Sequence, residues 1–238
     1  MTQKIVRRLG ERLDHIFRWV DSAQPYDTIW DLCCDHGRLG LHLHKKHLNA
    51  YVYLVDKVAA IIDQVVEDFG YLDDGRLSFI TADVRELEAL EVVPQKRTLI
   101  IIAGVGGNSL ITMLEGVLTR LGGEVALDFM LSPNCQTFEL REFLRSRPFC
   151  LIDEAFVTEK KFSHEHFWVR YDSRRSSIGE GALTECVPVS TIGDGLWKEM
   201  TDTKRAYVRK LLCHYQRMLD NRNSTLAGAA IKAYTRLL

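Results

Sequence analysis

The stretch TIWDLCCDHGRLGLHLHKKHL, residues 28–48, decides the expected fold. Its first seven residues form a largely apolar, strand-sized run, a short turn follows, and residues 39–48 have helical periodicity. The same order recurs along the chain, with further β-branched runs at 51–57, 77–83, 98–106 and 125–133 and helical periodicity at 58–69, 108–121 and 137–147. Because these runs are apolar on both faces, they predict a parallel sheet between two layers of helices.

The second half of the chain is expected to close this sheet and to add helices. The runs 149–158 and 166–171 follow each other without a long helix between them, which predicts an antiparallel hairpin. Five parallel strands plus a closing hairpin resemble the Rossmann-like, seven-stranded α/β plan of class I methyltransferases. We expect residues 1–172 to form that domain with an N-terminal helix. Residues 173–238 would be a linker and a coiled-coil-like helical region, with helices at 198–219 and 225–238.

Composition excludes several classes of protein. The 238 residues are 46% hydrophobic and 26% charged, which is ordinary for a soluble globular chain. No apolar run reaches the 18 residues of a membrane span, and the N-terminus has no apolar core of a secretory signal. The six cysteines form no C-x-x-C pair, so we expect reduced thiols in a cytoplasmic protein.

The net charge of −1 conceals a division of the chain. Residues 159–238 carry 14 lysines and arginines against nine acids, whereas the preceding part is acidic. This pattern permits a nucleic-acid contact on one face of the molecule. A solvated helix surface would produce the same pattern.

Acidic residues follow the expected strands where a ligand would bind. In open α/β sheets the ligand lies at the carboxyl ends of the strands, and Asp31, Asp35, Asp56 and Asp83 come at or next to three such ends. A carboxylate at the second strand can accept both ribose hydroxyls, and one at the third can accept an adenine amino proton. Small residues around Gly104 would allow close backbone approach. A single such aspartate is more often a turn or cap residue, but three in register favour a nucleoside cofactor.

The absence of phosphate-binding motifs narrows the choice of cofactor. No G-x-G-x-x-G follows the first strand, and the sequence contains no Walker A motif. A nucleoside cofactor without phosphate therefore fits best, and S-adenosylmethionine is the obvious candidate.

At this level of detail the sequence resembles a known family. The string DLCCDHGRLGLHL, residues 31–43, is similar to the first motif, D-I-G-S-D-H-A-Y-L-P, of the bacterial tRNA adenine-22 N1-methyltransferases. The resemblance continues through Ala82-Asp83, Ile102-Ala-Gly-Val-Gly-Gly107 (family I-A-G-M-G-G) and Ser132-Pro-Asn134 before Leu140-Arg141 (family Q-P-N…L-R), and it covers nearly the whole chain. The chain departs from the family at Cys33 for glycine, Cys34 for serine, Gly37-Arg38 for Ala-Tyr, Val84-Arg85 for Gly-Leu and Ser132 for Gln.

The resemblance implies a methyltransferase that uses S-adenosylmethionine to modify N1 of adenine 22 in tRNA, with no metal. The cofactor would be bound by Asp31, Cys33, Asp35, His36, Asp56, Lys57, Ala82, Asp83, Val84, Ala103 and Gly104. Adenine N1 already carries a lone pair, so the reaction mainly requires alignment of an unpaired or flipped base. Asp35 and Asn134 are the candidates for stabilising the cationic product, and His36, Arg141, Lys160, Arg205 and Arg209 the candidates for binding RNA.

Other interpretations remain open. Cys135 is a candidate nucleophile for cytosine C5 methylation, although it follows a Pro-Asn turn. The histidines at 42, 44 and 47 and at 164 and 166 lack a complete set of metal ligands. The same fold could act on another RNA, a protein or a small molecule, or serve as a non-catalytic RNA-binding scaffold.

Overall fold

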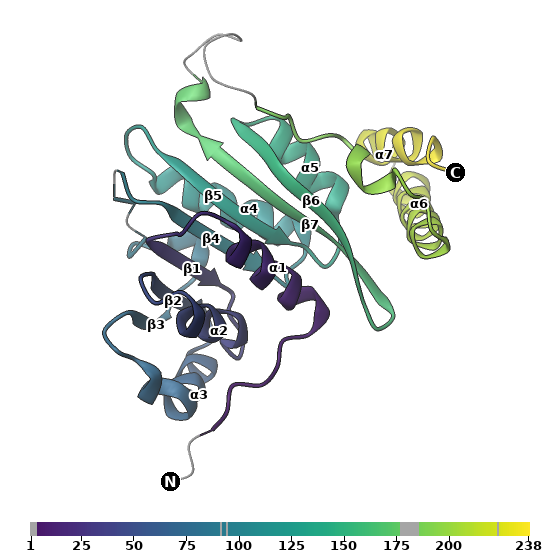
Figure 1. The fold of residues 1–238 in the computed structure, drawn as a ribbon. Helices are drawn as coiled ribbons and strands as arrows, with labels where there is room; N and C mark the ends of the chain where they lie inside the picture. Colours follow the sequence, from purple (N-terminus) through teal and green to yellow (C-terminus); the bar gives the residue numbers. More distant parts are fainter. Residues whose placement is uncertain (1–3, 91, 94, 177–185, 223) are drawn as a thin grey trace.

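One mixed sheet forms the centre of the protein. The structure is a computed structural model that describes residues 4–90, 92–93, 95–176, 186–222 and 224–238. The sheet has seven strands in the order β3-β2-β1-β4-β5-β7-β6, in which β7 is antiparallel to both of its neighbours (Figure 1). The expected plan is therefore confirmed. The strands are β1 (Thr28–Leu32), β2 (Tyr51–Asp56), β3 (Leu77–Thr81), β4 (Thr98–Ala103), β5 (Ala126–Ser132), β6 (Phe149–Glu159) and β7 (Phe162–Asp172).

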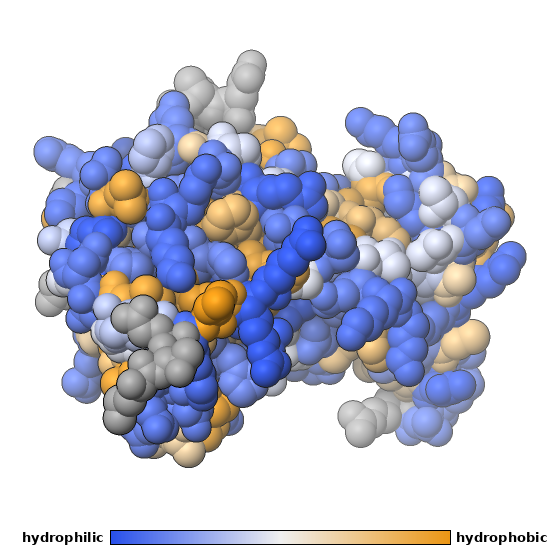
Figure 2. All heavy atoms as spheres, turned by 60° about the horizontal axis from the view of Figure 1, so that its bottom comes forward, coloured by the Kyte–Doolittle hydropathy of each residue, from blue (hydrophilic) through white to orange (hydrophobic). Residues whose placement is uncertain are grey.

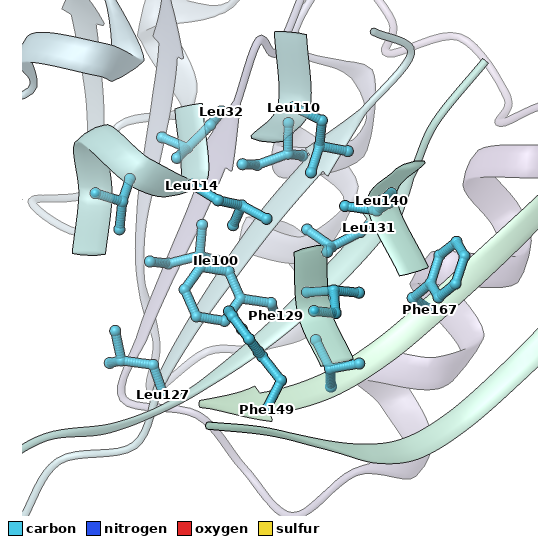
Figure 3. Packing of buried hydrophobic residues seen from close by; sticks show 14 of the residues in the cluster. Leu32, Ile100, Leu110, Leu114, Leu127, Phe129, Leu131, Leu140, Phe149 and Phe167 are labelled. Atoms are coloured by element: carbon cyan, nitrogen blue, oxygen red, sulfur yellow. The ribbon is translucent and has the colours of Figure 1, made fainter. Parts of the chain in front are cut away.

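Helices cover both faces of this sheet. One face packs against α1 (Glu11–Ser22), α2 (Arg38–Lys46) and α3 (Ala59–Phe69), and the other against α4 (Gly107–Arg120) and α5 (Thr137–Arg145). Alternate residues of each strand serve the two layers: Ile29 and Ile101 join the first core, and Leu32 and Ile100 join the second, which is drawn in Figure 3. Two short 3₁₀ helices, η1 (Gly70–Leu72) and η2 (Val84–Glu86), complete the connections before and after β3.

The topology creates a site at one edge of the sheet. After β1 the chain passes to α2 on one face, and after β4, which lies beside β1, it passes to α4 on the other. Strand order reverses between these two strands, and the loops at their carboxyl ends diverge there. The carboxyl ends of β1, β2, β3 and β4 therefore lie at the same edge of the sheet.

The C-terminal helices dock beside the β6–β7 hairpin (Figure 1). After η3 (Ser173–Ser176), the described chain resumes at Cys186 and forms η4 (Asp194–Trp197), α6 (Asp202–Arg222) and α7 (Thr225–Thr235). These helices share a third core with α5 and β6, in which the rings of Phe156 and Tyr207 are 5.2 Å apart and those of Phe138 and Tyr215 are 5.9 Å apart. The two expected helices are present with shifted bounds, because α6 begins after the turn that packs Trp197.

A buried ion network lies where this region meets the sheet. The side chain of Arg141 is fully buried; it donates to Glu165 through Nε and Nη2 (3.0 and 2.7 Å) and pairs with Glu154 through Nη1 (2.9 Å). The hydroxyls of Thr137 and Tyr207 both donate to Oε1 of Glu165, at 3.0 and 3.1 Å. The expectation that Arg141 contacts RNA is therefore corrected: its charge is matched internally and has no access to the surface.

The cysteine expectation is also corrected. Cys150 and Cys186 form a disulfide, whereas Cys33, Cys34, Cys135 and Cys213 are free. The two bonded residues are separated by 36 positions, and they meet because the chain returning toward the C-terminal helices forms a bridge between Leu151 and Val187. A search for closely spaced cysteine motifs cannot find such a pair.

No helix within the described residues is both long and apolar enough to cross a membrane.

Candidate active site

Asp31 links the first strand to the first turn of α2. It lies in β1, and its Oδ2 accepts a hydrogen bond of 2.9 Å from the backbone nitrogen of Gly40, the third residue of that helix. A Cβ on Gly40 would lie 3.1 Å from the same oxygen and 2.1 Å from Leu54, so the close approach needs glycine. Burial of the carboxyl raises the pKa of Asp31 to about 7, partly offset by the Gly40 hydrogen bond and the Arg12 charge.

The turn between β1 and α2 has an unusual backbone. Cys33, Asp35 and Gly37 all have positive φ, at 61°, 51° and 66°, a region that favours glycine. Cys33 occupies the position of the family's glycine, and its thiol lies 3.7 Å from the sulfur of Met113 in α4. The added side chain therefore packs toward the α4 layer, and burial raises the pKa of the Cys33 thiol to about 12.

Asp56, at the end of β2, holds two loops together. Its Oδ2 accepts a hydrogen bond from the backbone nitrogen of Asp35 at 3.2 Å, and its Oδ1 accepts one from that of Val58 at 3.1 Å. Its carbonyl oxygen accepts a hydrogen bond from Ala82, the first residue after β3, at 3.0 Å. The expected acids of the first two strands are thus connected, while the neighbouring Lys57 is exposed.

Asp83 is engaged by a residue that departs from the family pattern. Its Oδ1 accepts hydrogen bonds from the backbone nitrogen and Nε of Arg85, both at 2.9 Å, and its Oδ2 pairs with Nη2. These hydrogen bonds lower the pKa of Asp83 to about 2. Val84 between them is buried against the α4 side of the sheet. The acid is ionised, as an acceptor should be, but it already has a cationic partner.

The loop after β4 lies against the loop after β5. Gly104 has a φ of +87°, and its nitrogen donates to the carbonyl of Ser132 at 3.0 Å. The side-chain nitrogen of Asn134 donates to the carbonyl of Gly104 at 2.6 Å, and its backbone nitrogen donates to that of Val105 at 2.8 Å. Ala103, which pairs with Ser132 in the sheet, leads into this loop. Asn134 thus lies beside the small residues expected to approach a ligand.

Arg12 lies at the candidate site, and sequence reasoning did not single it out. It extends from α1, and a Cβ built on Gly104 would lie 3.5 Å from its Nη2. Asp31, Asp35 and Glu159 are the acids whose charges act on it. Nothing in the local sequence separates Arg12 from the other basic residues near the N-terminus, because only the tertiary fold turns this one toward the strand ends.

Two histidines of β7 lie between the sheet and α1. His166 is fully buried, its Nδ1 lies 3.3 Å from Nδ1 of His15, and burial with nearby positive groups holds its pKa well below the usual range. The pKa of His164 is also lowered, mainly by burial. Within the described residues, no group of three or more histidines, cysteines, aspartates or glutamates is arranged to hold a metal ion.

The remaining expected RNA contacts lie on the surface. His36 is exposed next to Asp35, with Nε2 3.7 Å from Oδ1 of that acid. Lys160 lies in the β6–β7 turn, and Arg205 and Arg209 lie on α6. Hydrophilic residues cover most of the face shown in Figure 2.

A cavity of about 930 Å³ lies at the opposite, amino-terminal ends of β4 and β5 and is separate from the candidate site. Its lining includes Arg97, Asp128 and Arg170.

A seven-stranded sheet of this order, with carboxylates at three successive strand ends, has the fold of the class I methyltransferases. A family model described as a methyltransferase domain matches residues 9–166. The chain therefore belongs to the methyltransferase domain family.

Comparisons with individual proteins agree with this assignment. The tRNA (adenine(22)-N(1))-methyltransferase of Bacillus subtilis is 27% identical over 160 residues, which is 64% of this chain and 60% of that protein. A relative from Mycoplasma genitalium is 24% identical, and the match covers 65% of this chain and 66% of the relative. These matches span less than two thirds of each curated relative.

Solved structures match nearly the whole fold. The crystal structure of the B. subtilis m1A22 tRNA methyltransferase TrmK has a TM-score of 0.65 at 21% identity, covering 96% of this chain and 95% of that one. The structure of M. capricolum TrmK with S-adenosylhomocysteine has a TM-score of 0.67 at 12% identity, covering 96% of each chain. The structural likeness includes the C-terminal helices.

Proposed function

We propose that the protein transfers a methyl group from S-adenosylmethionine to N1 of adenine 22 in tRNA. The observation that carries the proposal is the convergence of Asp31, Asp56 and Asp83 at the ends of three adjacent strands of a methyltransferase domain. The similarity to the B. subtilis enzyme of that specificity supports the choice of substrate.

The residues at the strand ends fit this cofactor. Asp56 keeps free acceptor lone pairs for ribose hydroxyls, because each oxygen accepts only one backbone hydrogen bond. Asp83 can share its carboxylate between Arg85 and an adenine amino group, because its Oδ2 accepts only the hydrogen bond from Nη2 of Arg85. Gly104 leaves room where a side chain would otherwise stand. We assign the cofactor to Asp31, Cys33, Asp35, His36, Asp56, Lys57, Ala82, Asp83, Val84, Ala103 and Gly104, and the bound cofactor would supply an electrophilic methyl group.

The target base would be held and stabilised by the loops after β1 and β5. Asn134 donates its side-chain nitrogen to Gly104, and its Oδ1 accepts no hydrogen bond from any described residue. That oxygen and the exposed carboxylate of Asp35 are suited to face an adenine ring that becomes positively charged on methylation. We propose Asp35 and Asn134 for this role, with His36 as a further contact to the base.

Methyl incorporation from labelled S-adenosylmethionine into an unmodified tRNA transcript tests the proposal. We expect label in a transcript with adenine at position 22 and none in a matched transcript with guanine there. Equal label in both would support the methyltransferase activity but would assign it to a nucleotide other than adenine 22. No label with cofactor bound would indicate another substrate, and no cofactor binding would favour a non-catalytic scaffold.

The region 173–238, together with the β6–β7 turn, is proposed to bind the tRNA. Within the described residues the side chains of Arg205 and Arg209 form no ion pair, and Lys160 is exposed in its turn. Basic groups at the protein surface are suited to contact phosphates. Arg141 is left out of this surface because of its burial.

Reversing two of these charges should weaken tRNA binding selectively. The variant with Arg205→Glu and Arg209→Glu is expected to lose about tenfold or more in tRNA affinity at physiological salt, with a shallower salt dependence, because two phosphate contacts are lost. Its cofactor affinity should match that of wild type. Lys45→Glu with Lys46→Glu on α2 is the control of equal charge change. If both variants bind tRNA alike, the helices have a structural role only.

We also propose the cytoplasm as the compartment, since it holds the tRNA pool. The Cys150–Cys186 bond stands against this assignment, because disulfides are uncommon in reducing compartments.

A further inference from the structure

Among the described residues, Arg12 is a cation without a partner at the edge of the candidate site. Its side chain forms no hydrogen bond and no ion pair with any of them, and its Nη1 is buried without a hydrogen-bond partner. The group is half-buried between α1 and the strand ends, with its guanidinium against the backbone of Gly104. Buried polar groups are normally satisfied, so this exception calls for an explanation.

The surroundings of Arg12 keep its charge but do not neutralise it by contact. Burial lowers the pKa of Arg12, while the charges of Glu159, Asp31 and Asp35 act in the opposite direction. None of these three acids comes within ion-pair distance. Glu159 instead reaches the position where a Cβ of Gly10 would stand, at 1.8 Å from its Oε1. An anion placed beside Gly104 would meet a guanidinium whose donors are otherwise unused.

We propose that Arg12 binds the carboxylate of the amino-acid end of the methyl donor. The inference rests on the proposed function and adds a residue outside the strand-end motifs. The charges of Asp31 and Asp35 act on Arg12 without contacting it, so the candidate site holds a cation in the same region as two carboxylates. An α-amino acid carries the opposite pair, a carboxylate beside an ammonium. The position of Arg12 against the backbone of Gly104, with its Nη1 buried, favours this small ligand over an RNA phosphate.

Two ligands that differ only in that carboxylate test the proposal. S-adenosylmethionine and its decarboxylated form share the nucleoside, the sulfonium and the ammonium, and calorimetry can measure the affinity of each. Wild type should prefer S-adenosylmethionine by at least about tenfold, as expected for a charge-assisted bidentate contact. In Arg12→Gln this preference should fall to about twofold, through loss of affinity for S-adenosylmethionine alone.

Controls separate this role from others. Arg18→Gln removes the same charge from the exposed side of α1, where Arg18 pairs with Asp14, and should leave the preference unchanged. Arg12→Lys should retain part of it. Equal loss of both ligands in Arg12→Gln would overturn the proposal in favour of a structural role, and an unchanged preference with weakened tRNA binding would assign Arg12 to an RNA phosphate. If wild type binds neither ligand, the proposed function itself has failed.

Discussion

Replacing Arg141 with alanine is expected to lower the free energy of unfolding by about 3–5 kcal/mol, because it leaves buried carboxylates without their cation. Glu165 is fully buried, and the hydroxyls of Thr137 and Tyr207 would be its remaining partners. Glu154 would lose the group that lies 2.9 Å from its Oε2. Urea denaturation followed by tryptophan fluorescence measures the change, since Trp197 lies in the affected core.

The matched control is Arg145→Ala on the same helix. Arg145 is exposed and pairs with Glu142 one turn earlier, a contact worth less than about 1 kcal/mol. If Arg141→Ala costs no more than this control, the buried network does not hold the C-terminal helices to the sheet. Arg141→Lys should also destabilise, because lysine cannot replace the two-pronged contact with Glu165.

The second large effect is expected at Asp31, as a dependence of stability on pH. An acid whose pKa is about 7 in the folded protein and 3.8 in the unfolded chain binds its proton more tightly when folded. Its contribution to stability is therefore complete below about pH 4 and is lost as the pH rises to about 7. The loss is on the order of 4 kcal/mol, from about three pKa units.

Asp31→Asn should remove this loss. Asparagine cannot ionise, and its side-chain oxygen can still accept the hydrogen bond from Gly40. The variant should therefore be more stable than wild type at pH 8, equal to it near pH 4, and weaker in binding S-adenosylmethionine. Thermal or urea unfolding at several pH values measures the first two effects. Asp63→Asn, at an exposed position on α3, is the control. If the stability of Asp31→Asn changes with pH in the same way as that of wild type, the argument is contradicted.

Much of the fold could be predicted because it depends on local patterns. Apolar runs of strand length, separated by helical segments, are sufficient to indicate a parallel sheet, and the carboxyl ends of parallel strands necessarily share an edge. This is why Asp31, Asp56 and Asp83 could be grouped in advance. The direct link between Asp35 and Asp56, and the engagement of Asp83 by Arg85, depend on side-chain geometry that spacing does not contain.

The features that could not be predicted depend on contacts far apart in the chain. Arg141 looks like a surface arginine in sequence, and it is buried because Glu154 and Glu165 come from the two strands of the hairpin. Arg12 shares its helix with another arginine, and helical periodicity does not say which of them faces the site. The partner of Cys150 is fixed by the return of the chain along β6.

One oxygen of Glu165 connects the C-terminal helices with the start of α5. Thr137 begins α5 three residues after Asn134, and Tyr207 belongs to α6, yet both hydroxyls bind the same atom. A tilt of α6 cannot break its bond to that atom without changing the hydrogen bonding of the carboxylate that anchors the start of α5. The C-terminal helices are therefore coupled to the start of α5 through a shared hydrogen-bond acceptor as well as through the packing of Tyr215 on Phe138.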